Sequence, residues 1–222
     1  MPRFERYFDE GGNVSVFTPV ERQSGALTGR LPGVRNGFPL APFMGLMGTA
    51  RDTGELVDSV PPTVQGGNLD IHDLGVGSTL YLPLQVPGAM FFTGDPHRAQ
   101  GDGEVALTAR EGSLRATFRL SVVKPVGRGP SVAFDGYCFG ETAQSWLPIG
   151  PSDPDGPVDR QVDDLDVAVE QAVCNALAFL VEDLGMDAPV AYAYLSAAAD
   201  FQVSQVVGRT GIHALVRKAD VR

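Results

Sequence analysis

Residues 79–123 read TLYLPLQVPGAMFFTGDPHRAQGDGEVALTAREGSLRATFRLSVV, and this stretch decides the fold class. It opens with two short apolar pieces, 79–86 and 89–93, which Pro87-Gly88 separates. Pro and Gly end strands and form tight turns, and Pro83 places the first piece at a sheet edge or a bulge. The stretch therefore predicts a core of short strands rather than a helical bundle.

The second half of the same stretch predicts a hairpin. Apolar and polar side chains alternate over 114–123, which is the pattern of a half-buried strand, and less regularly over 103–111. Glu111-Gly112-Ser113 is a plausible tight turn between them. A further strand is expected within 131–139.

Two helices are expected toward the C-terminal end. Apolar residues over 165–184 follow an Asp at 163 or 164 that can cap a helix, and Gly185 stands where a left-handed C-cap belongs. A shorter helix is expected over 188–198, with Pro189 in its first turn. A strand is predicted over 201–207, and the tail from 208 is expected to be short and polar.

These elements predict an α+β fold. A β-sandwich or barrel-like sheet, built mainly from residues up to 140, would carry one long and one short helix. We expect one domain over 1–222. It would comprise a turn-rich β segment at 1–66, a β core with the site motifs at 67–147, and a helix–helix–strand end at 148–222.

The composition excludes several functions. The 222 residues include 17 Lys and Arg against 27 Asp and Glu, a formal charge of −10, which argues against binding nucleic acid or an anionic membrane surface. There is no apolar run of 18 residues and no signal-peptide pattern at Met1–Arg6. Two cysteines fit a reducing, cytoplasmic compartment. Cys174 is expected to be a buried core thiol, and Cys138 is more consistent with a structural thiol than with a nucleophile.

Polar side chains concentrate in two motifs, GGNLDIHD at 66–73 and GDPHRAQGDGE at 94–104. In extended backbone, alternate residues share a face. Three groups are therefore expected to project together. They are Asn68, Asp70 and His72; Asp95 and His97; and Gln100, Asp102 and Glu104.

Carboxylates with an imidazole suit a divalent metal such as zinc. Such a metal can polarise a carbonyl and activate water, while a remaining carboxylate acts as general base. The set therefore permits metal-assisted hydrolysis. The spacing alone also fits plain Asp- and Gly-rich turns between strands, and His72 is more typical of a surface histidine than of a metal ligand.

Longer strings resemble the acetamidase/formamidase family. They are PFMGLMGTA (42–50), GGNLD (66–70), STLYLPLQVPGAMFFTGDPHRAQGDGEV (78–105) and AYAYLSAAADFQVSQVV (191–207), in the family's order and spacing over about residues 30–210. The resemblance implies hydrolysis of the linear C–N bond of a small amide such as formamide or acetamide, with release of ammonia. It also implies a cytoplasmic homo-oligomer and a metal site.

The family's polar motif positions fall on Asn68, Asp70, Asp95, His97, Gln100, Asp102 and Glu104. Chemistry, rather than the resemblance, suggests their roles. Asp70, Asp95 and His97 would hold a divalent metal, with zinc the first choice. Glu104 would be the general base, Asn68 and Gln100 would orient the amide or the oxyanion, and Asp102 would belong to the same catalytic group.

The chain departs from the family at one point. Family members carry a further N-terminal β-rich segment with a G-P-I-Y-V-E-G-A-x-P-G-D-like motif, which these residues do not contain. Three alternatives stay open. The chain is a compact family member, one subunit of a split hetero-oligomeric amidohydrolase acting on a specialised amide, or a non-catalytic binding relative.

Overall fold

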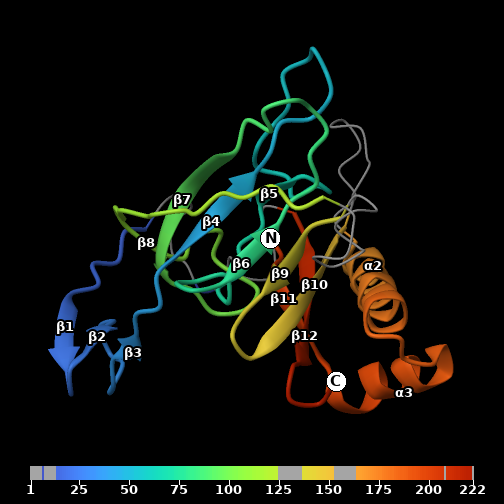
Figure 1. Ribbon diagram of the computed structural model, residues 1–222. Coiled ribbons are helices and arrows are strands. Elements are labelled where there is room, and N and C mark those ends of the chain that lie inside the picture. The colour runs from blue at the N-terminus through green and yellow to red at the C-terminus, as the bar shows by residue number, and fades with distance from the viewer. Residues whose placement is uncertain (1–6, 8–13, 125–136, 153–163, 208, 222) are drawn as a thin grey trace. The chain divides into compact units, whose positions relative to one another are not determined.

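Figure 1 shows a computed structural model of the chain, which describes residues 7, 14–124, 137–152, 164–207 and 209–221. The chain forms two compact units, residues 1–40 and 41–222. Among the described residues, neither helix combines the length and the hydropathy needed to cross a membrane.

The first unit contains a small antiparallel sheet of β1 (Val20–Gln23), β2 (Ala26–Gly29) and β3 (Phe38–Pro39). Ser24 and Gly25 join β1 to β2, and both have positive φ, 49° and 88°. Two positive φ angles in a two-residue loop match the twist of the strands they join.

The second unit contains two antiparallel sheets. The four-stranded sheet has the order β5-β4-β7-β8, with β4 at Phe43–Gly48, β5 at Gly66–Asn68, β7 at Phe92–Ala99 and β8 at Arg110–Glu111. The five-stranded sheet has the order β11-β12-β10-β9-β6, with β6 at Thr79–Tyr81, β9 at Phe139–Glu141, β10 at Ser145–Pro151, β11 at Asp200–Gln205 and β12 at Gly211–Arg217.

The first of two helices packs on β10 and β12 of the five-stranded sheet, and the second packs against the first and joins the same buried cluster (Figure 1). The first, α2 (Leu165–Ala178), is capped by the Asp164 carboxylate and continues as a wider helical turn, η2 (Phe179–Asp183). Gly185 ends it with a φ of 66°. The shorter helix α3 covers Ala188–Ala198. Both helices lie where the sequence predicts them.

A narrow stripe of small residues on α2 packs against the sheet. Ala168, Ala172 and Ala176 are fully buried. A Cβ added to Gly150 on β10 would lie 2.3 Å from the Ala172 backbone nitrogen, so the two elements meet at backbone distance. Only these alanines and Asn175 are buried on α2, so Cys174 is exposed, and the prediction of a buried thiol there is wrong.

Side chains of β12 alternate between the face of the sheet that the helices cover and the opposite face. Ile212, Ala214 and Val216 are buried in the clusters formed with the helices. His213 alternates with them, so its fully buried side chain projects from the opposite face. The expectation of a short polar tail from 208 is therefore wrong, because β12 is an inner strand of the sheet.

The hairpin predicted at 103–123 is also wrong. Residues 103–109 form turns and a short bridge, only Arg110–Glu111 pairs as β8, and no strand forms over 114–123. Alternation fixes which side chains share a face, but a strand also needs a neighbour for its backbone groups, and none of the described strands pairs with this segment. The side chains of Leu120 and Val122 are 68% and 74% exposed.

The α+β class, with one long and one short helix near the C-terminal end of a β-rich body, is confirmed. The strand predicted over 201–207 is β11. The first predicted strand, 79–86, ends early at Tyr81. Of the strand predicted within 131–139, residues 131–136 lie outside the described part of the chain, and β9 begins at Phe139.

Candidate active site

The site lies where β4 and β7 run side by side. β7 carries Asp95 and His97, and β4 pairs with it so that Phe43 faces His97 and Met44 faces Pro96. Gly45 follows Met44 on β4, and because it has no side chain, only backbone atoms border the site at this position. A Cβ at Gly45 would lie 2.4 Å from Asp70 Oδ1 and 3.0 Å from Asp95 Oδ2.

The imidazole of His97 is fully buried, and its tautomer follows from Gln100. The Gln100 amide nitrogen donates to the backbone oxygens of Asp70 (2.7 Å) and Ser204 (3.2 Å). The amide oxygen therefore faces His97 Nδ1 at 2.8 Å and accepts the proton that Nδ1 carries. In the neutral ring this leaves the lone pair on Nε2.

Three carboxylates converge on that lone pair. His97 Nε2 lies 3.1 Å from Asp95 Oδ2, 3.7 Å from Glu104 Oε1 and 3.9 Å from Asp70 Oδ1. Nε2 and Asp70 Oδ1 are both buried without a hydrogen-bond partner among the described residues. Two unsatisfied polar atoms facing each other across a short gap indicate a place for a cation.

Burial raises the pKa of two of the acids around this gap. Burial, with repulsion from Glu104 and Asp95, raises the pKa of Asp70 to about 9. Burial also raises the pKa of Glu104, although the nearby His97 partly offsets this. A bound divalent cation would reverse this preference, because it favours the charged carboxylates.

The donor set fits a metal ion. One ligand atom from each of Asp70, Asp95 and His97 lies within 4.8 Å of the others, and His97, Glu104 and Glu111 form a second such group. An imidazole nitrogen with carboxylate oxygens is a donor set that zinc accepts. The orphaned atoms and the bare backbone at Gly45 leave room for the ion.

The backbone is strained at the three acids that face His97. Asp70, Asp95 and Glu104 have φ angles of 48°, 53° and 40°. Residues with a Cβ rarely adopt positive φ, and such strain clusters at functional sites because the surrounding structure has to hold it.

A cavity of about 290 Å³ opens beside these groups. Asn68, Asp95 and Glu104 line it, and each of them contacts the buried Asp70 or His97. Asn68 Nδ2 donates a hydrogen bond to Asp70 Oδ2. The other lining residues are Leu46, Val60, Leu107, Glu111 and Gln205.

Six of the seven predicted site residues meet at this place, and Asp102 does not. Its carboxylate instead contacts His72 Nε2 at 2.9 Å, away from the carboxylates around His97. The expectation that His72 projects with Asn68 and Asp70, and Asp102 with Gln100 and Glu104, is therefore wrong. The turn from Gly101 to Glu104 breaks the strict alternation of an extended strand.

Sequence reasoning missed Glu111 and Gln205. Glu111 stands in the predicted hairpin turn, but it pairs with His97 through β8. Gln205 reaches the cavity because its strand forms a parallel bridge with Gly103. Both depend on strand pairing that local sequence does not report.

Cys138 is buried, and its thiol donates to the backbone oxygens of Thr63 and Val64. Burial raises its pKa to about 12, which agrees with a structural thiol rather than a nucleophile.

Comparison with known proteins decides the family. The model of the acetamidase/formamidase family matches residues 52–216. The chain belongs to this family. It is 49% identical to the acetamidase of Mycolicibacterium smegmatis over 47 residues, and 47% identical to the formamidase of Methylophilus methylotrophus over 49 residues. These matches cover 21% and 22% of this chain, and 12% of each relative.

Solved structures of family members share the fold. An acetamidase from Yersinia enterocolitica superposes with a TM-score of 0.69 at 25% identity, covering 88% of this chain and 54% of that one. An acetamidase from Bacillus halodurans gives 0.66 at 25% identity, covering 90% and 61%. The chain thus corresponds to little more than half of each solved relative.

Proposed function

We propose that this chain hydrolyses the C–N bond of a small linear amide to a carboxylate and ammonia, using a divalent metal, zinc by preference. Asp70, Asp95 and His97 would hold the ion. The observation that carries the proposal is the unsatisfied pair His97 Nε2 and Asp70 Oδ1, which lies against residues that line the cavity. Family membership supports the choice of an amide as substrate.

When bound, the metal would polarise the amide carbonyl and lower the pKa of water. Glu104 would accept a proton from the attacking water and pass it to the departing nitrogen, so that R–CO–NH2 and water give R–COOH and NH3. Burial raises the pKa of Glu104, which makes its carboxylate a stronger proton acceptor than a free glutamate.

Asn68 and Gln100 would play different parts. Asn68 lines the cavity, and its bond to Asp70 uses only one of its two amide hydrogens, so the other can hold the carbonyl oxygen of the substrate. The Gln100 amide is engaged by Asp70, Ser204 and His97. We therefore give Gln100 the role of fixing the His97 tautomer.

The test is ammonia release from formamide, acetamide and propionamide by natively purified protein whose metal content is measured on the same sample. We expect turnover that a chelator removes and zinc restores, and that Glu104→Gln abolishes with the metal retained. Metal-loaded protein without turnover on the panel would favour the non-catalytic binding relative.

We also propose that the active unit is an assembly, formed either by further copies of the chain or with a hetero-oligomeric partner. The observation that favours this is the segment 114–123. It exposes Leu120 and Val122, carries Arg115 and Arg119 between apolar residues, and has no strand partner among the described residues.

Sedimentation of the natively purified protein tests this second proposal. An assembly larger than the 23.5 kDa chain is expected, and Leu120→Lys with Val122→Lys should dissociate it. A fully active monomer would contradict it. Gel analysis separates copies of this chain from a second polypeptide.

A further inference from the structure

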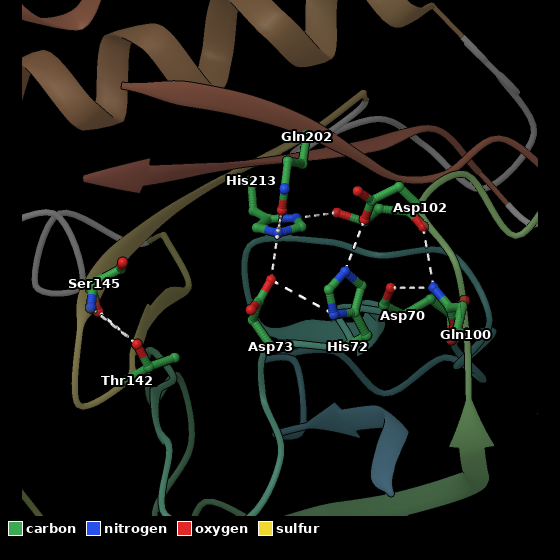
Figure 2. A network of polar contacts seen from close by, with 10 residues as sticks. Asp70, His72, Asp73, Gln100, Asp102, Thr142, Ser145, Gln202 and His213 are labelled. Carbon is green, nitrogen blue, oxygen red and sulfur yellow. Dashed lines mark hydrogen bonds and ion pairs between the residues drawn. The ribbon is translucent and has the colours of Figure 1, made fainter. Parts of the chain in front are cut away.

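A second polar cluster lies next to the candidate active site and takes no part in the chemistry above. Figure 2 shows it as a row of alternating carboxylates and imidazoles, Asp102, His72, Asp73 and His213, which we call the aspartate–histidine row. Asp102 Oδ1 lies 2.9 Å from His72 Nε2, and His72 Nδ1 lies 3.7 Å from Asp73 Oδ2. Asp73 Oδ2 lies 3.2 Å from His213 Nε2.

One end of this row is fixed in the sheet. His213 stands on β12 and is fully buried. Its Nδ1 lies 2.8 Å from Ser204 Oγ, and its Nε2 also lies 3.1 Å from Gln202 Oε1. Both ring nitrogens therefore have partners, and the hydrogen bond from His213 holds the pKa of Asp73 below its usual value.

The other end of the row lies on the turn that carries Glu104. Asp102 is two residues before Glu104, and Gly103 between them is bonded to β11 and the residue after it. Its N–H donates to Val203 O at 2.7 Å, and its carbonyl accepts from Val206 N–H at 3.1 Å. The Asp102 side chain fastens this turn to His72, which follows Asp70 by two residues (Figure 2).

Two other functions fit the row less well. Ser204, His213 and Asp73 are the residue types of a hydrolytic triad, but Ser204 is 1% exposed and does not line the cavity. A second metal would need free ligand atoms in one place, whereas Asp102 already engages Nε2 of His72, and His213 has both its nitrogens engaged.

We propose that His72 and Asp102 are positioning residues, which hold the Gly101–Glu104 turn against the segment that carries Asp70 and so set the Glu104 carboxylate opposite His97. This inference rests on the proposed role of Glu104 as general base. Glu104 has a strained φ of 40°, so its position depends on contacts that hold the turn on both sides.

The experiment uses His72→Ala, Asp102→Ala and Asp102→Asn in the natively purified protein. Asp102→Asn keeps an oxygen that can accept the His72 hydrogen bond. Asp220→Ala is the matched control, because Asp220 pairs with Arg217 at 2.8 Å on the surface, outside the active site and the row. The readouts are kcat and KM for amide hydrolysis, metal content, and hydrogen exchange of the peptide that covers residues 101–106.

Both alanine variants are expected to lower kcat by about 10- to 100-fold, the usual cost of removing a supporting contact. KM should change little, and metal content should match the unmodified protein. Exchange of the Gly103 and Glu104 amides should accelerate. Asp102→Asn should recover most of kcat and of the protection, and Asp220→Ala should change neither.

Unchanged kcat and unchanged exchange in both alanine variants would overturn the proposal. So would loss of kcat that follows loss of metal or general unfolding, because the row would then support the fold and not Glu104. If the unmodified protein hydrolyses no amide, the proposed function fails, and the exchange of residues 101–106 still decides whether His72 and Asp102 hold the turn.

Discussion

Two histidines are fully buried in this chain, and their surroundings differ. His213 has a partner at each ring nitrogen, supplied by Ser204, Asp73 and Gln202. Among the residues that the structure describes, His97 has one hydrogen-bond partner, Gln100, and its other nitrogen faces three carboxylates without a hydrogen bond. Burial alone therefore does not mark a functional histidine, whereas an unsatisfied ring nitrogen that faces several carboxylates does.

The sharpest test of this difference is His97→Ala. We expect loss of the bound metal and a fall in amide turnover of about 10³-fold or more, because a metal contributes several kcal/mol and each 1.4 kcal/mol is tenfold. Metal analysis and ammonia release measure both effects. A variant that keeps its metal and its activity would sink the assignment of the site.

Glu104→Gln tests whether Glu104 acts as the general base or as a metal ligand. The amide keeps the size and polarity of the carboxylate but cannot take a proton. We expect kcat to fall by about 10²- to 10⁴-fold, the range of general base catalysis, with metal content unchanged. If metal is lost instead, Glu104 is a ligand, as its place in the His97, Glu104 and Glu111 group would allow.

His213→Ala removes the satisfied histidine. Here the metal should stay, and the protein should lose about 1–3 kcal/mol of unfolding free energy, because Ser204 and Asp73 lose a buried partner. Urea unfolding of metal-loaded protein measures this. Loss of metal comparable to that in His97→Ala would erase the distinction between the two histidines.

The smallest expected effects are those of pH on the free energy of unfolding, and they have opposite signs for Asp70 beside His97 and Asp73 beside His213. In metal-free protein Asp70 has its pKa raised to about 9, so the folded state holds a proton that the unfolded state releases near pH 4. Its contribution is full at low pH and is lost as pH rises toward 9.

Asp73 behaves in the opposite way. Its pKa is lowered by the hydrogen bond from His213, so its contribution is present above the unfolded pKa and is lost as pH falls. Unfolding curves from pH 3 to 9 should therefore show Asp70→Asn flattening the alkaline decline, and Asp73→Asn the acid decline. Saturating zinc should remove the alkaline decline in the unmodified protein. An alkaline decline that is the same in Asp70→Asn would contradict the assignment.

Residue spacing could predict much of the site. Asn68 and Asp70, and Asp95 and His97, stand two apart and do meet. Spacing could not show that His72 and Asp102 leave the group, because this depends on a turn at Gly101–Glu104 that docks on β11. Nor could it show Glu111, which only the pairing of β8 with β7 brings to His97.

The fold shows the same limit. Helices α2 and α3 make their own backbone hydrogen bonds, and caps near Asp164 and Gly185 mark where the first begins and ends, so local sequence suffices. A strand depends on a distant neighbour. Residues 114–123 alternate well and form no strand, while β12 looks like a polar tail and lies inside the sheet because β10 and β11 flank it.

Gly45 gives a way to read other sequences of the family. At this position one methyl group would overlap Asp70 Oδ1 and crowd Asp95 and His97, all of which meet over its bare backbone. A relative that retains every acid and histidine of the site but carries alanine there should have a filled centre. The residue at this one aligned position would then distinguish family members that can bind the metal from members that cannot.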